Sequence, residues 1–491
     1  MNDLKKKILE LQKISEALEP KEEERNRYFS EVHDYANRFI NDLPKTNAFS
    51  NERASPNAFK ISDKQKSLKS ILDLYSKEIA SKGINAASGG HLGYIPGGGI
   101  YTSALADYLA DVTNEYVGVN YSSPGGVAVE LELLDWMKDI FGFPRSAIGN
   151  LSSGGSIANL IALTAARDKH SIKNDRITKS VIYASPQVHH CINKALRIIG
   201  LEDVIINHLE LDDGSRIVPA DLQAKIDADI ANGFNPFMVI ASAGTTDTGA
   251  IDPLDELGQI AKINNLWYHI DAAYGGFFIL VDRKKEAFKG IEMADSLVID
   301  PHKGLFLPYG LGAVLVKDKQ AVYKSHRYHA NYMQDAVSDD SPVNPADVSP
   351  ELTKHFRSLR MWLPLQLHGI KPFIACLDEK LFQTQYFRNR LVEIGFEVGP
   401  EPDLSVSYFW YPTDDDKENE FNDKLMQEIH KDGEIFFSST MINGKFVIRM
   451  ALLSFRTKID TLERAIAMIE KAKQKIKHDI NPIDKESIEI Q

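Results

Sequence analysis

Short runs of β-branched and aromatic residues alternate with helical patterns from residue 180 to residue 316, and this alternation restricts the possible folds most. The apolar runs occupy residues 180–185, 204–211, 237–244, 267–275, 296–300 and 312–316. Helical patterns lie between several of them, at 188–199, 219–231 and 253–264. Strands that alternate with helices usually pair in parallel, with helices covering both faces of the sheet. We therefore expect an α/β domain with a mainly parallel sheet.

The sequence on either side of this region predicts two further parts. Residues 1–45 are rich in charge and carry an apolar stripe at helical spacing, formed by Leu4, Ile8, Leu11, Ile14 and Leu18. Beyond Phe373, helical and strand patterns alternate and end in a helix. A chain of 491 residues exceeds one ordinary domain. We expect an N-terminal helical segment at 1–105, a large α/β domain at 106–372 and a small α+β domain at 373–491.

Charge and cysteine content exclude several classes of protein. Lys and Arg number 57 against 69 Asp and Glu, a net charge of −12 that disfavours nucleic acid as a partner. Cys191 and Cys376 lie far apart in the sequence, so we expect neither a disulfide framework nor a thiolate metal site. Such a chain suits a reducing, cytoplasmic compartment. No apolar run is typical of a signal peptide or a membrane span, and no membrane partner is expected.

Lys303 is the strongest candidate for chemistry. It follows a buried-strand pattern in ADSLVIDPHKG, between a histidine and a glycine. A partly buried amine loses its proton more easily, and a neutral amine attacks an aldehyde to form a Schiff base. The alternative is an exposed lysine, the usual state of this residue type. The position at the end of a strand favours the reactive amine.

Asp271 ends another strand pattern, WYHIDAAYGG. A carboxylate at the carboxyl end of a strand lies where α/β sheets bind ligands. Such a carboxylate can keep the pyridine nitrogen of pyridoxal 5'-phosphate (PLP) protonated, which makes the ring an electron sink. The alternative is that Asp271 only caps the turn that follows.

A turn rich in serine and glycine runs into an amphipathic helix in NLSSGGSIANL. Gly154, Gly155 and Ser156 would place free backbone N–H groups at the helix N-terminus, where phosphate binds, although a plain N-cap is the alternative. The turn lacks the signatures of a P-loop and of a dinucleotide site, which argues against a nicotinamide dehydrogenase. His189 follows the strand at 180–185 and could stack on a cofactor ring. No set of zinc ligands accompanies it, so no metal is expected.

Together these motifs resemble the group II PLP-dependent amino-acid decarboxylases, the family of aromatic-L-amino-acid, histidine, glutamate and cysteine-sulfinate decarboxylases. The resemblance extends from about His91 to Arg456. It implies the fold of the PLP-dependent transferases, the aspartate aminotransferase-like fold type I. It also implies a homodimer with active sites at the subunit interface, and the N-terminal helices would pack on the partner subunit.

The resemblance assigns a role to individual residues. Lys303 becomes the Schiff-base lysine, Asp271 the partner of the pyridine nitrogen and His189 the residue stacked on the ring. Further cofactor contacts are implied for Gly155, Ser156, Thr246, Ala273, Ser296, Asp300 and His302. Substrate contacts are implied for Tyr94, Ile95, Pro96 and Gly97. Tyr332, in HANYMQD, matches a tyrosine that returns a proton to Cα, with Tyr328 as the alternative.

The expected reaction is decarboxylation of an L-amino acid to an amine and carbon dioxide. The residues Tyr94, Ile95 and Pro96 favour an aromatic or neutral substrate over an acidic one, which would need a cationic group. One rival is another PLP reaction on the same fold, by an aldehyde synthase, an aminotransferase or a carbon–carbon lyase. Another is a catalytically silent binding scaffold. Tyr332 and His189 favour decarboxylation, and release of ammonia or peroxide would indicate the first rival.

Overall fold

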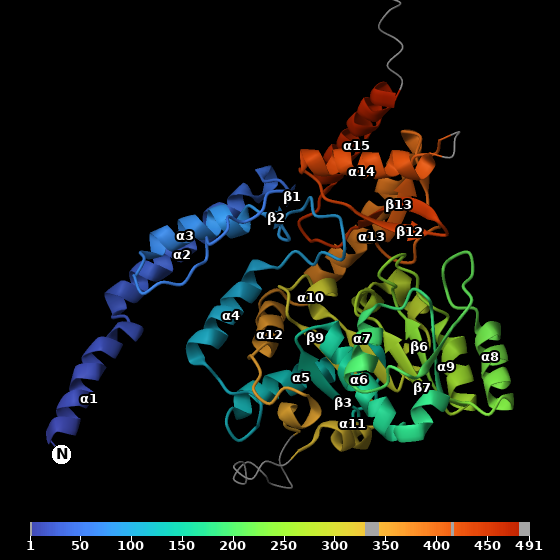
Figure 1. Ribbon diagram of the computed structural model, residues 1–491, viewed down its shortest axis with the longest axis horizontal. Coiled ribbons are helices and arrows are strands. Elements are labelled where there is room, and N and C mark those ends of the chain that lie inside the picture. The colour runs from blue at the N-terminus through green and yellow to red at the C-terminus, as the bar shows by residue number, and fades with distance from the viewer. Residues whose placement is uncertain (1, 329–342, 414–416, 481–491) are drawn as a thin grey trace, which may run out of the picture.

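A seven-stranded sheet forms the centre of the molecule in the computed structural model, which describes residues 2–328, 343–413 and 417–480 (Figure 1). Its strands, in spatial order, are β3 (Ile148–Ser152), β9 (Gly312–Val316), β8 (Ser296–Ile299), β7 (Trp267–Asp271), β6 (Asn235–Ser242), β4 (Ser180–Ala184) and β5 (Ile205–His208). Only β9 runs antiparallel to its neighbours β3 and β8. The remaining pairs are parallel, so the prediction of a mainly parallel α/β sheet is confirmed.

Helices cover both faces of this sheet, and each face has its own hydrophobic cluster. One cluster receives residues of α6 (Gly155–Lys169), α7 (Cys191–Ile198) and α11 (Lys319–His326). The other receives residues of α5 (Pro124–Phe141), α8 (Pro219–Ala231) and α9 (Leu254–Ile263). Successive residues of a strand point to opposite faces, so Trp267 of β7 lies in the first cluster and Tyr268 in the second.

The N-terminal helices form an arm that extends from the body, as Figure 1 shows in blue. They are α1 (Asn2–Ser15), α2 (Glu22–Asp42) and α3 (Leu68–Tyr75), and α4 (Tyr101–Thr113) returns the chain towards the sheet. No residue of α1 or α2 is buried in this chain. The apolar stripe that predicted these helices therefore faces outward. A short antiparallel pair joins β1 (Phe49–Ser50), between α2 and α3, to β2 (Gly83–Ile84), which follows α3.

The C-terminal part has its own four-stranded antiparallel sheet. The strands, in spatial order, are β10 (Glu397–Val398), β11 (Val406–Trp410), β13 (Lys445–Ala451) and β12 (Ser438–Ile442). The helices of this part are α13 (Lys371–Glu393), α14 (Glu418–Asp432) and α15 (Ile459–Ile480). Helix α12 (Ser358–His368) precedes them and packs against α4 and α5. A third hydrophobic cluster lies here, between the sheet and α13, α14 and α15. Among the described residues, no helix is long and apolar enough to cross a membrane.

Strand β3 is not predicted by the local sequence pattern. Its residues include Gly149 and Asn150, which are poor strand formers, so the local pattern resembles a loop. Pairing with β9 and complete burial make it a strand. A Cβ on Gly149 would lie 2.7 Å from Leu134 of α5, so a side chain there would prevent this close packing. Tertiary contacts therefore override the local preference.

Candidate active site

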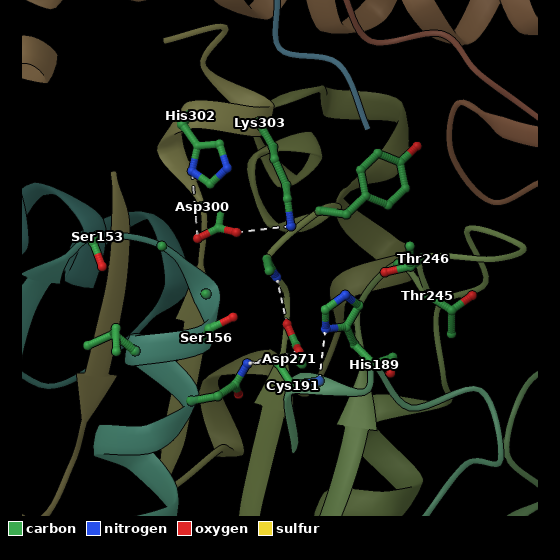
Figure 2. A pocket seen from close by; sticks show the side chains of 18 of the residues that line it. Ser153, Ser156, His189, Cys191, Thr245, Thr246, Asp271, Asp300, His302 and Lys303 are labelled. Atoms are coloured by element: carbon green, nitrogen blue, oxygen red, sulfur yellow. Dashed lines mark hydrogen bonds and ion pairs between the residues drawn. The ribbon is translucent and has the colours of Figure 1, made fainter. Parts of the chain in front are cut away.

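A cavity of about 270 Å³ lies where strands β4, β6, β7 and β8 end and helix α6 begins (Figure 2). The carboxyl ends of parallel strands share one edge of the sheet, so the loops that follow them surround a common space. Nine of the predicted cofactor residues line this cavity: Gly155, Ser156, His189, Thr246, Asp271, Ala273, Asp300, His302 and Lys303. The fold therefore brings together side chains that are far apart in the sequence.

Lys303 forms an ion pair with Asp300 across the cavity wall, and the Nζ to Oδ2 distance is 2.9 Å. Asp300 precedes the one-turn helix α10 (Pro301–Gly304), which carries Lys303, and its carboxylate is almost fully buried. Burial lowers the pKa of Lys303, but the negative charges of Asp300 and Asp271 outweigh burial and raise it overall. Asp300 Oδ1 has no hydrogen-bond partner among the described residues. Asp300 thus holds the amine in its protonated form.

Asp271 is held through both carboxylate oxygens. Oδ1 accepts the backbone N–H of Ala273 at 3.0 Å. Oδ2 accepts the side-chain amide of Asn159, on α6, at 3.1 Å. The carboxylate also faces the cavity, and Figure 2 shows it below Lys303 at the end of its strand. These contacts fix its orientation and leave acceptor capacity for a ligand.

The glycine turn before α6 brings backbone close to the cavity. Gly154 has a φ of 151°, a conformation that residues with a Cβ rarely adopt. A Cβ on Gly155 would lie 3.0 Å from Asp300 Oδ2, and one on Gly312 would lie 2.5 Å from the carbonyl carbon of Gly154. The first N–H groups of a helix have no partner within the helix and attract anions. The turn therefore fits a phosphate group.

His189 presents a neutral ring to the cavity. Its Nδ1 accepts the backbone N–H of Cys191 at 3.3 Å, so the ring proton lies on Nε2. Burial lowers the pKa of His189, and this effect outweighs the negative charge of Asp271, which raises that pKa. The ring of His190 lies 4.2 Å from it, centroid to centroid. A flat, neutral imidazole suits stacking on an aromatic cofactor.

Ser296, for which a cofactor contact was predicted, does not line this cavity. Ser296 begins β8, so it lies at the opposite end of the strand from Lys303. It is fully buried, and its hydroxyl contacts the side chains of Trp267 and His269. Ligands bind at the carboxyl ends of parallel strands, whereas Ser296 stands at the amino end of β8.

The predicted substrate segment does not line this cavity either. Ile95 packs in the hydrophobic core, and Tyr94 is 58% exposed. A Cβ on Gly97 would lie 2.1 Å from the carbonyl oxygen of His302, so this glycine packs directly on the backbone of α10. The segment thus lies beside the helix of Lys303 without entering the cavity.

Tyr332 lies outside the described residues. Its alternative, Tyr328, is 87% exposed. Among the described residues, no group of three or more His, Cys, Asp or Glu side chains could hold a metal ion.

Two residues that were not predicted also organise the site, namely Asn159 and Arg449. Asn159 contacts Asp271 from the first turns of α6. Arg449 of β13 donates to the backbone carbonyls of Tyr94, Thr246 and Asp247, so it joins the C-terminal sheet to the cavity wall. The spacing of Trp267, His269 and Asp271 along one strand face is the signal that could have led to Asn159, because a buried polar face requires partners.

The amine of Lys303, the carboxylate of Asp271 and the glycine turn match the aldehyde, the ring nitrogen and the phosphate of PLP. A family model described as the pyridoxal-dependent decarboxylase conserved domain matches residues 51–412. The aromatic-L-amino-acid decarboxylase of Bacillus atrophaeus is 35% identical over 390 residues, which cover 78% of this chain and 80% of that protein. Tryptophan decarboxylase 2 of Oryza sativa subsp. japonica is 30% identical over 401 residues, which cover 78% and 80% respectively.

A solved structure of Oryza sativa TDC with PLP and tryptamine superposes with a TM-score of 0.88, at 21% identity. The superposition covers 93% of this chain and 99% of that one, and it confirms the expected fold type I. PLP is the cofactor, and the chain belongs to the family of pyridoxal-dependent decarboxylases, the PLP-dependent carboxy-lyases that act on amino acids.

Proposed function

We propose that this chain decarboxylates an aromatic L-amino acid to its amine and carbon dioxide, and that Lys303 holds the cofactor. The observation that carries the proposal is the convergence of Lys303, Asp271 and the glycine turn on one cavity. When bound, PLP supplies an electron sink for the bond that breaks between Cα and the carboxylate. The chain itself must bind the cofactor, orient the substrate and return a proton to Cα.

Each role follows from the contacts of the residue. Asp271, fixed through both oxygens, holds a proton on the pyridine nitrogen. Lys303 would hold the aldehyde carbon of PLP through its amine, and the carboxylate of Asp300, 2.9 Å from that amine, would pair with the ammonium form whenever the amine is free. His189 covers one face of the ring with a neutral imidazole. Gly155 and Ser156 bind the phosphate through the N-terminus of α6.

The proposed preference for an aromatic side chain rests on how the nearby arginines are used. Arg449 donates to three backbone carbonyls, and Arg456 donates to those of Ala87, Gly98 and Gly99. Arg360 forms two hydrogen bonds of 2.9 Å with Asp107. An acidic substrate side chain would compete for cations that the protein already uses, and a buried unpaired charge is costly. The similar proteins named for aromatic amino acids and for tryptophan support the same preference.

Carbon dioxide release from a panel of L-amino acids tests the proposed substrate. We expect release from tryptophan, tyrosine or phenylalanine, and none above background from glutamate or cysteine sulfinate. Release from the acidic pair alone would overturn the substrate class. Ammonia without carbon dioxide would indicate a different PLP reaction.

We also propose that Tyr332 returns the proton to Cα, a role that rests on the resemblance of HANYMQD to the family's motif. Tyr332→Phe should then divert the product from the amine to an aldehyde, with oxygen consumed and ammonia and peroxide released. Tyr328→Phe is the matched control, because Tyr328 is the neighbouring exposed tyrosine. If the Tyr328 variant forms the aldehyde and the Tyr332 variant forms the amine, the two roles are reversed.

A homodimer in the cytoplasm completes the proposal. The outward-facing stripe of α1 exposes Leu4, Ile8 and Leu11 by 68%, 47% and 53%. A contiguous exposed apolar face favours burial against a second subunit. Cys191 and Cys376 are free thiols, which suits a reducing compartment.

A further inference from the structure

Three side chains of β7 point to the same face of the sheet, namely Trp267, His269 and Asp271. They lie two residues apart, and side chains alternate between faces along a strand. The register pairs His269 with Ser296 on the neighbouring strand β8. Asn159 of α6 covers this face from above, and it is fully buried. A row of polar side chains therefore lies within an otherwise apolar interface between the sheet and α6.

Hydrogen bonds join these side chains into one continuous chain. Trp267 Nε1 lies 2.8 Å from Ser296 Oγ, and the same Oγ lies 2.7 Å from His269 Nδ1. His269 Nε2 lies 2.7 Å from Asn159 Oδ1. The Asn159 amide nitrogen then lies 3.1 Å from Asp271 Oδ2. Trp267, Ser296, His269 and Asn159 are each no more than 3% exposed, so water does not compete.

The two ends of this chain determine the direction of every hydrogen bond. An indole N–H can only donate, and an ionised carboxylate can only accept. The nitrogen of Asn159 must therefore face Asp271, which turns its oxygen towards His269. His269 must carry its proton on Nε2, since that nitrogen faces an acceptor.

The other ring nitrogen of His269 is then an acceptor, and Ser296 donates to it. Complete burial lowers the pKa of His269 to about 4, so the ring is neutral and carries only that one proton. All donors consequently point towards Asp271. Hydrogen bonds aligned in one direction polarise and strengthen one another.

We propose that Trp267, Ser296, His269 and Asn159 form a directed relay that positions Asp271 and keeps it an acceptor for the pyridine nitrogen. The inference rests on the proposed role of Asp271 in binding the cofactor. These four are positioning residues, since none is required to touch the reacting atoms. The relay uses neutral dipoles, so it stabilises the carboxylate without neutralising it as an adjacent cation would.

Cofactor affinity of the apoprotein tests the relay independently of activity. Two probes are compared by fluorescence titration: PLP, and an analogue in which carbon replaces the ring nitrogen. Ser296→Ala removes the acceptor for Trp267 and the donor to His269. We expect its affinity for PLP to fall about ten- to a hundredfold, the usual effect of losing a group that supports a ligand-binding residue. Its affinity for the carbon analogue should not change.

Ser180→Ala is the matched control. Ser180 is also fully buried, also begins a strand of the same sheet, and also forms hydrogen bonds through its hydroxyl, with Arg176 and Asn235. It should leave both affinities unchanged. Ser296→Thr keeps the hydroxyl and should restore discrimination between the two probes. Asn159→Asp removes the donor and adds a like charge beside Asp271, so it should weaken PLP binding selectively.

The outcomes separate failure of the relay from failure of the proposed function. Equal loss of affinity for both probes in Ser296→Ala, or no loss, would overturn the relay. If the wild-type protein binds both probes equally, the proposed contact between Asp271 and the pyridine nitrogen is contradicted, whatever the variants show.

Nitrogen NMR of histidine-labelled apoprotein gives a second readout, with the signal assigned through His269→Gln. We expect the proton on Nε2, and a proton on Nδ1 would contradict the direction of the relay.

Discussion

The ion pair between Asp300 and Lys303 places opposite demands on one lysine. In its proposed role the amine of Lys303 must be neutral to bond with the cofactor aldehyde, whereas the buried carboxylate 2.9 Å away favours its protonated form. The carboxylate also lies beside the turn that fits the phosphate. If Lys303 holds the cofactor as proposed, Asp300 should slow its attachment to the aldehyde, because it favours the protonated amine.

Asp300→Asn should shift the pH dependence of cofactor attachment. Asp300 raises the pKa of Lys303, so its removal lowers that pKa and more of the amine is neutral at a given pH. The rate at which apoprotein forms the lysine-dependent absorption band, measured across pH, should rise at lower pH in the variant. Asp295→Asn, a carboxylate at the far end of β8, should leave the profile unchanged. An unchanged profile in Asp300→Asn would contradict this role.

Gly97 explains why the segment of Tyr94 to Gly97 is tied to the site without lining it. Gly97→Ala would place a methyl group 2.1 Å from the carbonyl oxygen of His302 and push α10 away. We expect the variant to lose about 1–3 kcal/mol of stability, as overpacked sites do, and to bind PLP more weakly. Thermal unfolding and cofactor titration measure both effects.

Gly125→Ala provides the comparison for this substitution. Gly125 lies in α5 with open space around its Cα, so a methyl group there should be neutral or stabilise by up to about 1 kcal/mol. If both alanine variants behave alike, the close approach of Gly97 to α10 has no energetic consequence.

Among the secondary-structure elements, the sequence predicts those helices and strands that have a regular apolar pattern of their own. The helix at 219–231 and the strand at 312–316 have the expected boundaries, because each has a strong apolar pattern and clear ends. β3 could not be predicted, since its glycine and asparagine gain strand geometry only from β9 and α5. The roles of Asn159 and Ser296 depend on strand register and helix placement, which no local pattern encodes.

A buried ion pair connects α5 to the segment that begins at residue 343. Lys354 Nζ lies 2.7 Å from Glu130 Oε1, and the two side chains are 0% and 2% exposed. The same oxygen accepts the backbone N–H of Leu151 in β3, the strand that leads into the glycine turn. The pair thus supports the strand that leads into the glycine turn.

Lys354→Met should destabilise the protein by about 3–5 kcal/mol, because Glu130 would be left as an uncompensated buried charge. Denaturant unfolding measures the loss. Adding Glu130→Gln should recover part of it, since the second change removes that charge. Lys424→Met breaks an exposed pair with Glu420 and should cost no more than about 0.5 kcal/mol. Equal costs for the two lysine variants would contradict the importance of burial.

At the scale of the whole molecule, the helices α1 and α2 of the N-terminal arm bury none of their residues within the chain. An isolated helix of 14 residues is only marginally stable in water, and α1 buries none of its residues in this chain. In the proposed dimer, the apolar stripe packs against the second copy of the chain. Sequence periodicity predicts the stripe, but it does not say what covers it.

Replacing Leu4, Ile8 and Leu11 together with lysine should weaken the proposed dimer, because three charges would enter the buried face. Mass photometry across a dilution series should give twice the chain mass for the wild type and a larger monomer fraction for the variant. Ile263→Lys changes another exposed apolar residue, 80% exposed on the edge of α9, and should not alter the mass. A wild-type monomer at all concentrations would contradict the dimer.

The measurement that tests the central claim most directly is location of the bond between cofactor and protein. Borohydride reduction of the protein with PLP makes that bond permanent, and peptide mass spectrometry then identifies the lysine. We predict one modified residue, Lys303, with the modification and the visible absorption band both absent from Lys303→Ala. Modification of a different lysine, or none in the wild-type protein, would contradict the assignment of this cavity as the active site.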